Sequence, residues 1–125
     1  MKNIIDDELT YKIIGCAMKI HNTLVNGFQE VIYQRCLAIE LHKAKIQFLR
    51  EQDMSIFYDQ INVGTRRADF IIEGKVLVEL KALIRLEEVH LAQALNYLTA
   101  YQIELGLLIN FGSTSLEVKR LFRTH

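Results

Sequence analysis

The chain of 125 residues has no proline and only six glycines, and it contains neither a low-complexity stretch nor an internal repeat. Segments of that kind mark linkers, so no boundary between domains is evident along the chain. No apolar run approaches the roughly 20 residues that a membrane-spanning helix needs. We therefore expect residues 1–125 to fold as one domain around one core, without entering a membrane.

Cysteine is also scarce. Cys16 and Cys36 each stand beside apolar residues in an expected helix, and the sequence has no CxxC pair. Two such residues cannot hold a structural zinc ion or an iron–sulfur cluster unaided. They are typical of buried thiols in a reducing compartment, although a disulfide stays open. The N-terminal MKNIIDDELT becomes acidic within six residues, unlike a secretory signal, which favours the cytoplasm.

Net charge is absent as well, since fifteen basic residues balance fifteen acidic ones. A neutral chain has little general electrostatic attraction for nucleic acid. The balance does not exclude a local basic rim around a metal site, where the ions themselves neutralise phosphate groups. Charge therefore restricts the function without deciding it.

Apolar residues spaced by three and four positions predict helices. The first helix is expected over Asp7 to Leu24, with Asp6 or Asp7 as its cap and Asn26-Gly27 as its end. The other two helices are expected over residues 29–44 and 87–100. Short β-branched, aromatic or continuously apolar segments predict strands over residues 47–60, 67–72, 76–82 and 106–111.

The order of these elements, α-α-β-β-β-α-β, predicts an α/β fold with a mixed central sheet flanked by helices. Gly74 lies at the centre of the turn that makes a hairpin of strands 67–72 and 76–82. The tail from Leu116 to Phe122 is either a final strand or a helix, and its pattern does not separate the two.

The segment RADFIIEGKVLVELKA, residues 67–82, carries the chemistry. On its second strand Glu79 and Lys81 share a face, although the strand is otherwise apolar. An uncompensated buried charge is costly, so these groups need partners. Asp69, expected at the start of the neighbouring strand, is placed to lie across from them.

Two interpretations of these charges stay open. In the first, Glu79 and Lys81 form a buried ion pair, and Asp69 bonds to Arg67. In the second, Asp69 and Glu79 hold a hard divalent cation, with the backbone carbonyl of Leu80 as a third ligand. Lys81 would then hold or deprotonate the attacking water and stabilise the charge of the transition state.

The pattern D-x(9)-E-x-K at a strand–turn–strand resembles the PD-(D/E)XK nuclease superfamily, with Asp69, Glu79 and Lys81 at its signature positions and Ala68 in place of the proline. Residues 27–33, GFQEVIY, read as G-x-x-E-x-x-Y. The chain resembles the family named for that motif along most of its length, in the segments HNTLVNGFQEVIYQRCLAIEL, RADFIIEGKVLVELKA, AQALNYL and GLLINFG.

This resemblance implies a restriction-endonuclease-like core of the RecB-like branch. It implies that Glu30 joins the metal shell, although Glu30 could instead only stabilise its helix through the dipole. Gln93 and Tyr97 share a helix face, and the resemblance assigns them to the substrate; the alternative is a core-edge tyrosine with a surface glutamine. Tyr33, one turn from Glu30, is a further candidate for substrate contact.

Other polar residues are weaker candidates. His90 is expected to be a solvated residue at the start of its helix rather than a ligand. Basic residues at strand and chain ends are candidates for phosphate contacts: Arg66, Arg67, Lys119, Arg120 and Arg123.

These features predict hydrolysis of phosphodiester bonds in nucleic acid, DNA before RNA, with one or two Mg²⁺ or Mn²⁺ ions. One alternative is a non-catalytic module that binds nucleic acid or protein on the same fold, and another is hydrolysis of a different phosphate ester, such as a nucleotide. A homodimer also stays open, because paired sites would suit the cutting of both strands of a duplex.

Overall fold

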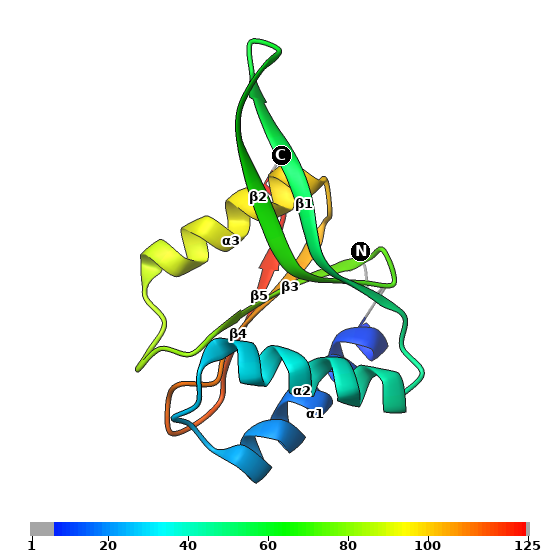
Figure 1. The fold of residues 1–125 in the computed structure, drawn as a ribbon, viewed down its shortest axis with the longest axis vertical. Helices are drawn as coiled ribbons and strands as arrows, with labels where there is room; N and C mark the ends of the chain where they lie inside the picture. Colours follow the sequence, from blue (N-terminus) through cyan, green and yellow to red (C-terminus); the bar gives the residue numbers. More distant parts are fainter. Residues whose placement is uncertain (1–6, 125) are drawn as a thin grey trace.

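A five-stranded mixed sheet with three helices forms the protein in the computed structural model, which describes residues 7–124 (Figure 1). The elements follow in the order α1 (Asp7–Leu24), α2 (Glu30–Lys43), β1 (Phe48–Tyr58), β2 (Ile61–Ile72), β3 (Val76–Lys81), α3 (Glu88–Tyr101), β4 (Leu105–Asn110) and β5 (Glu117–Phe122). The strands lie in that same order in the sheet. Only β3 and β4 run parallel, and the other pairs are antiparallel. The α/β class with a mixed sheet is confirmed.

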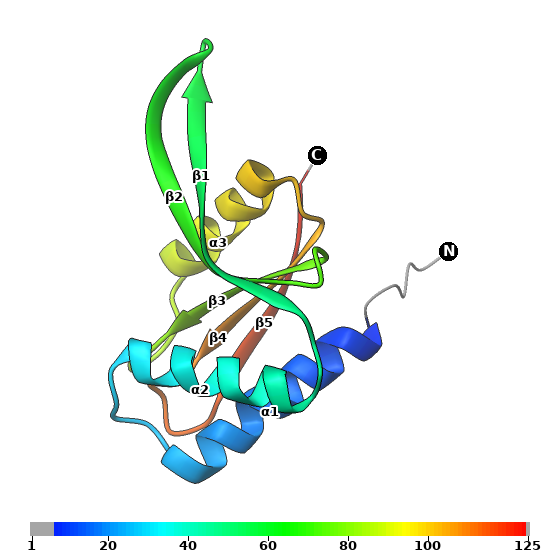
Figure 2. The same cartoon turned by 45° about the vertical axis from the view of Figure 1, so that its right-hand side comes forward.

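The sheet separates two apolar layers, with α1 and α2 on one face and α3 on the other (Figures 1 and 2). Val78 and Leu80 of β3 pack toward α1 and α2, while Leu77 packs against Leu98 of α3. Since side chains alternate along a strand, Glu79 and Lys81 lie on the α3 face with Leu77. The expected division of this strand into two faces is therefore confirmed.

The hairpin of β1 and β2 is longer than the sequence suggests. β2 begins at Ile61 rather than Arg67, so Asp69 lies well inside the strand and not at its start. Asp59 and Gln60 form the turn, with φ angles of 50° and 65°, as a two-residue type I′ turn requires. The end of this hairpin projects beyond the rest of the molecule (Figures 1 and 2). Residues 61–67 are all exposed, so no buried face imposed an apolar alternation on them.

The structure settles two points that the sequence left open, the form of the C-terminal tail and the state of the two thiols. The tail is a strand, β5, paired with β4 from Leu105↔Phe122 to Asn110↔Glu117. Cys16 and Cys36 are free and partly buried, so the disulfide alternative is not formed. The cap expected at Asp6 and the side chain of Asp7 lie outside the described residues. Within residues 7–124, no helix combines the length and apolar character that crossing a bilayer requires.

Gly112, after β4, lies directly against the loop that follows β3. A Cβ atom on Gly112 would stand 2.3 Å from both the backbone nitrogen and the backbone oxygen of Leu83. We expect Gly112→Ala to lower the free energy of unfolding by about 3 kcal/mol, because two backbone segments must move apart. Urea denaturation measures the change. Gly15→Ala on α1 is the control, since its Cβ meets nothing within 4 Å and should be neutral or stabilising. Equal midpoints for wild type and Gly112→Ala would contradict this packing.

Candidate active site

The two acidic residues of the motif meet where strands β2 and β3 part. The β2–β3 ladder runs only from Ile72↔Val76 to Phe70↔Val78. Beyond it, the Asp69 N–H donates to Glu79 Oε2 at 2.8 Å, and the Leu80 N–H donates to Asp69 Oδ2 at 2.8 Å. Each carboxylate therefore takes the place of a backbone acceptor. This reciprocal bonding holds the Asp69 and Glu79 side chains together at the edge of the gap.

The backbone carbonyl of Leu80 points toward the same gap. The Phe111 N–H, next to β4, donates to the carbonyl of Lys81 at 2.8 Å. Successive peptide groups of a strand point to opposite edges, so the Leu80 carbonyl points away from β4, on the same side as the Leu80 N–H that bonds Asp69. The groups that Asp69, Glu79 and Leu80 present to the gap are therefore all oxygen atoms, which can act as metal ligands. Such a set suits a hard divalent cation such as Mg²⁺ or Mn²⁺.

The charges at this site are poorly compensated. Glu79 is only 8% exposed, and burial together with the charge of Asp69 raises the pKa of Glu79 to about 8. Burial raises the pKa of Asp69 as well. Within residues 8–124, neither carboxylate has a lysine, arginine or histidine nitrogen within 4 Å. Two adjoining carboxylates, Glu79 buried and Asp69 partly buried, have oxygens to spare for a bound cation, so the residues present fit the ion that the sequence implies.

The competing ion-pair interpretation is wrong. Glu79 forms no ion pair with Lys81 among the described residues. Arg67 does not bond to Asp69 either, because its Nε and Nη2 atoms donate to the carboxylate of Asp53 at 2.8 and 3.1 Å. Asp53 faces Arg67 across the β1–β2 ladder, which places the pair on the hairpin.

Lys81 lines a small pocket between β3 and α3. Its other walls come from α3, β3 and β4, and they are Glu79, His90, Gln93, Ala94, Tyr97 and Leu108. The structure therefore brings Gln93 and Tyr97 beside Glu79 and Lys81, as the family resemblance implied. An ammonium, an amide and a phenol surround a buried carboxylate here, and all three can donate hydrogen bonds to an anionic group.

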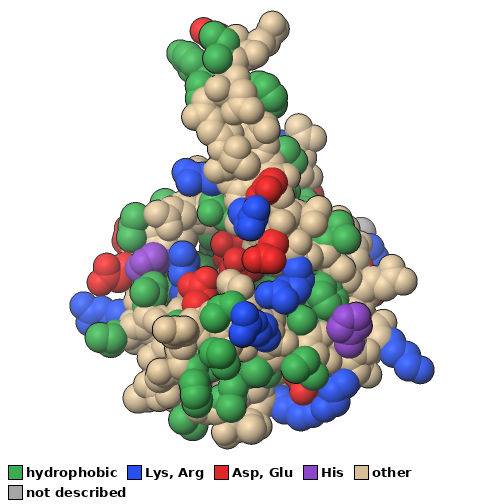
Figure 3. All heavy atoms as spheres, in the orientation of Figure 1, with side chains coloured by type: hydrophobic (Ala, Val, Ile, Leu, Met, Phe, Trp, Pro, Cys, Tyr) green, Lys and Arg blue, Asp and Glu red, His purple; other side chains and the backbone are tan. Residues whose placement is uncertain are grey.

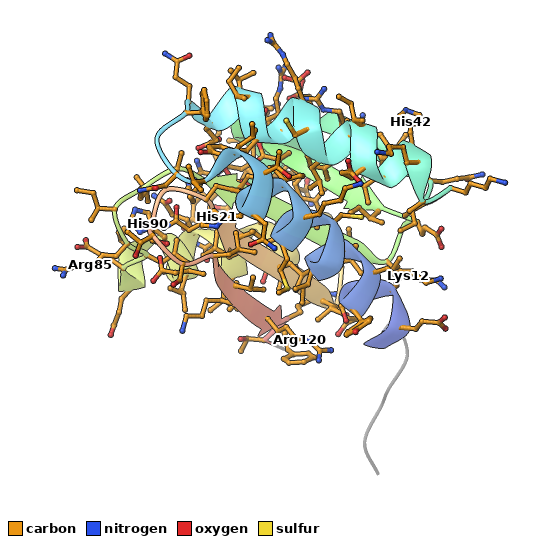
Figure 4. All side chains as sticks on the ribbon, turned by 90° about the horizontal axis from the view of Figure 1, so that it is seen from below. Lys12, His21, His42, Arg85, His90 and Arg120 are labelled. Atoms are coloured by element: carbon orange, nitrogen blue, oxygen red, sulfur yellow. The ribbon has the colours of Figure 1, made fainter. Side chains whose placement is uncertain are left out.

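His90 has a structural role at the start of α3 (Figure 4). Its Nδ1 atom accepts a hydrogen bond from the Glu87 N–H at 2.9 Å, and the Glu87 side chain bonds the His90 backbone in return. This reciprocal capping box stabilises the first turn of the helix. The expectation of a helix-start histidine agrees with this geometry.

Glu30 begins α2 and is half-buried near the acidic pair. Gln34 Nε2 donates to Glu30 Oε2 at 3.1 Å. Burial, followed by the charge of Asp69, raises the pKa of Glu30, while the charge of Lys81 opposes the rise. Among the described residues, no three His, Cys, Asp or Glu side chains are close enough to share a metal ion. Glu30 thus lies near Asp69 and Lys81 without being placed as a direct third carboxylate ligand.

Tyr33 was predicted to contact a substrate, but its position in the core does not fit that role. The residue is fully buried, and its ring stacks on Phe111 with the ring centres 4.6 Å apart. Its hydroxyl donates to the carbonyl of Val25 at 2.6 Å and accepts from the Phe28 N–H at 3.2 Å. Tyr33 therefore closes the loop between α1 and α2, which in turn fixes where α2 and Glu30 begin.

Asn110, at the end of β4, supports the site and was not singled out from the sequence. It is fully buried; its Oδ1 accepts from the Leu83 N–H at 2.8 Å, and its Nδ2 donates to the Leu83 carbonyl at 3.0 Å and to Glu117 Oε1 at 2.8 Å. These bonds hold the loop that follows Lys81. The available signal was a polar residue inside the apolar run GLLINF, the same signal that drew attention to Glu79.

Acidic side chains gather on one face of the molecule. Figure 3 shows Asp and Glu side chains gathered near the centre of this face, below the projecting hairpin, with Lys and Arg side chains around them. In the same orientation of Figure 1, α3 lies to one side of this area and α2 below it. Negative charge at the centre of this face is therefore bordered by positive charge.

A mixed sheet with helices on both faces, carrying Asp, Glu and Lys on β2 and β3, is a restriction-endonuclease-like α/β fold. The family model for the PD-(D/E)XK nuclease superfamily matches residues 7–121, and the chain belongs to that superfamily. A solved structure titled "Crystal structure of SSO0001" is 21% identical, with a TM-score of 0.59, over 75% of this chain and 50% of that one. At this identity the likeness concerns the fold, and the present chain spans about half the length of that protein. No curated protein matches.

Proposed function

We propose that this protein is a metal-dependent nuclease that hydrolyses phosphodiester bonds in nucleic acid, with DNA rather than RNA as its substrate. The observation that carries the proposal is the reciprocal bonding of Asp69 and Glu79, which holds a partly buried and a buried carboxylate together, with no ion pair to either among the described residues. Membership of a nuclease superfamily supports the reaction class. The preference for DNA follows the general habit of that superfamily.

Asp69, Glu79 and the carbonyl of Leu80 would hold one or two Mg²⁺ or Mn²⁺ ions. When bound, the ion lowers the pKa of a bound water and offsets the charge of the phosphate group. Lys81 would orient the attacking water and donate to the phosphate oxygens as their charge grows. Glu30, which lies near both Asp69 and Lys81, would act through a water molecule, accepting its hydrogen bond rather than binding the ion directly.

The substrate would be held by residues of α3 and of the hairpin. Gln93 and Tyr97 line the pocket of Glu79 and Lys81, and both can donate hydrogen bonds to a phosphate without adding charge. Arg67 is exposed and would contact a phosphate group other than the one that is cleaved. Such a contact would compete with its ion pair to Asp53, which costs little because the pair is exposed.

We further propose that the chain belongs to the G-x-x-E-x-x-Y family, in the RecB-like branch. The supporting geometry is that Gly27, at φ 117°, and Tyr33 shape the loop before α2, so that Glu30 begins the helix near Asp69.

All five strands share one sheet, which supports a single domain over residues 1–125. Two free thiols support a reducing compartment such as the cytoplasm. A homodimer with two sites stays a proposal.

Incubation with labelled single- and double-stranded DNA and RNA tests the function, with Mg²⁺, Mn²⁺ or EDTA present. We expect DNA cleavage that requires the ion. Glu30→Gln should reduce the rate by about 10- to 100-fold, because a group that orients the metal-bound water is lost. Glu40→Gln is the matched control, since Glu40 lies on the same helix but pairs with Lys19 and Lys43.

Asp69→Ala, purified in the same way, measures any contaminating nuclease. Cleavage that survives EDTA, or that is equal in wild type and Asp69→Ala, would remove the assignment. Ion binding without cleavage of any substrate would favour a non-catalytic module on the same fold.

A further inference from the structure

A groove lies between the projecting β1–β2 hairpin and α3, outside the pocket of Glu79 and Lys81. Its volume is about 860 Å³, which is within the range of ligand-binding clefts. We call it the arm groove. Its walls include Met54, Ile56, Val63 and Arg66 from the hairpin and Asn96 and Thr99 from α3.

The arm groove begins where the candidate active site ends. The guanidinium of Arg66 lies over the ring of Tyr97, 5.7 Å from its centre. Tyr97 also lines the small pocket with Glu79 and Lys81, and its neighbour Asn96 lines the groove. A chain of nucleotides with one phosphate at the active site would therefore pass Tyr97 and Arg66 as it enters the groove.

The two walls of the groove are fastened to each other by Tyr101, the last residue of α3. Its hydroxyl accepts a hydrogen bond from the Ala68 N–H at 3.0 Å and donates to the carbonyl of Gln52. Gln52 and Ala68 face each other across the β1–β2 ladder, so the phenol bridges the two strands at the base of the projecting hairpin. The groove is thus formed before any ligand arrives, which lowers the entropic cost of binding.

The chemistry of the arm groove suits an unpaired strand better than a duplex. Among the residues that line it, Arg66 is the one cation, and no acid is present. A duplex presents its phosphates outward and is bound through several cations. A single strand exposes the faces of its bases, which apolar and aromatic side chains can cover. Met54, Ile56 and Val63 supply such surfaces, and Asn96 and Thr99 supply hydrogen bonds.

We propose that the arm groove binds a single-stranded segment of nucleic acid that adjoins the bond to be cut. Arg66 holds the phosphate next to the active site, and the apolar wall of the hairpin lies under the bases. This inference rests on the proposed nuclease function for the identity of its ligand. It adds a preference for substrates with an unpaired end or gap, which the acidic site alone does not supply.

Fluorescence anisotropy in EDTA tests the groove without cleavage, with Lys81→Ala as the parent protein. The probes are a blunt DNA duplex and the same duplex with a single-stranded overhang on either end. We expect the parent to bind one overhang at least about 10-fold more tightly than the blunt duplex. Ile56→Ser and Arg66→Ala should each remove most of that advantage. Leu49→Ser is the matched control, because Leu49 is an exposed apolar residue of the same strand outside the groove.

Thermal melting confirms that each variant is folded, and light scattering reports its oligomeric state. Equal overhang affinity in the parent, Ile56→Ser and Arg66→Ala would overturn the proposal. A dimer that Ile56→Ser converts to a monomer with unchanged DNA affinity would also overturn it, and would identify the groove as a subunit interface. Loss of overhang binding in both variants would support the proposed role of the groove even if the wild type cleaves no substrate. Failure of the nuclease function and failure of the groove proposal therefore give different results.

Discussion

Lys81→Met is expected to reduce DNA cleavage by about 1000-fold while Mn²⁺ binding persists, because general acid–base and electrostatic catalysis by one side chain contribute about that much. Lys81 lines the pocket beside Glu79 but forms no ion pair with the described acids. Its ammonium is therefore available to a water molecule and a phosphate oxygen. Methionine keeps the unbranched length of the stem and removes the charge.

Single-turnover cleavage and calorimetric titration with Mn²⁺ separate the two effects. Asp69→Asn should lose both cleavage and ion binding, since Asp69 would hold the ion. Lys12→Met is the matched control: Lys12 lies on α1, well away from His90 and the pocket (Figure 4), and pairs with Glu8 at 3.6 Å. Cleavage by Lys81→Met within a few-fold of wild type would exclude Lys81 from the chemistry.

Glu79→Gln is expected to make the ion-free protein more stable at pH 8.5 while abolishing ion binding and cleavage. The amide oxygen of glutamine can still accept the hydrogen bond from the Asp69 N–H, which the Glu79 carboxylate accepts at 2.8 Å. The substitution removes a buried negative charge that faces a second carboxylate. A residue kept for its chemistry at a cost in stability would behave in this way.

The raised pKa of Glu79 also determines whether the folded protein gains or loses stability as the pH rises. Burial and the charge of Asp69 raise the pKa of Glu79 to about 8, so the folded protein holds a proton that the unfolded chain releases near its ordinary pKa of 4.5. The stability from this group is fully present below pH 4.5 and is lost as the pH rises through 8. In EDTA, the melting temperature of wild type should therefore fall across this range by about 5 °C or more, and less in Glu79→Gln.

Thermal melting with EDTA or with excess Mg²⁺ measures this effect. Added Mg²⁺ should raise the melting temperature of wild type at pH 8.5 and leave that of Glu79→Gln unchanged. Glu40→Gln is the control, because it removes a carboxylate that pairs with Lys19 at 3.1 Å and should lower the melting temperature. A lower melting temperature for Glu79→Gln at pH 8.5 without Mg²⁺ would show that the Glu79 charge is compensated in the fold.

Glu79 and Lys81 were recognisable in advance because charges inside an apolar strand contradict the pattern around them, and Asp69 was recognisable because its spacing from them resembles a nuclease motif. The same rule applied to Asn110 would have identified the residue that holds the loop after Lys81. Tyr33 shows the limit of such reasoning. A tyrosine carries an apolar ring and a polar hydroxyl, so its type agrees equally with substrate contact and with the buried position that it occupies.

The extent of the β1–β2 hairpin was not predictable in the same way. Its outer residues are exposed, and Asp59-Gln60 is not the Asn-Gly or Asp-Gly pair that usually marks a type I′ turn. The arm groove was not predictable from the sequence either, because it depends on a hydrogen bond between the hydroxyl of Tyr101 and the backbone of Ala68, 33 positions earlier in the chain.

The sequence by itself determined the α/β class and the two faces of β3, because hydrophobic periodicity acts over neighbouring residues, and its resemblance to a known motif singled out Asp69, Glu79 and Lys81. Only the tertiary structure decided which hydrogen bonds those charges make, that Glu30 stands near them without joining a three-ligand cluster, and that the hairpin leans over α3 to form a groove. These outcomes depend on contacts between residues far apart in the chain. Such contacts follow from how the elements pack, and no local pattern records them.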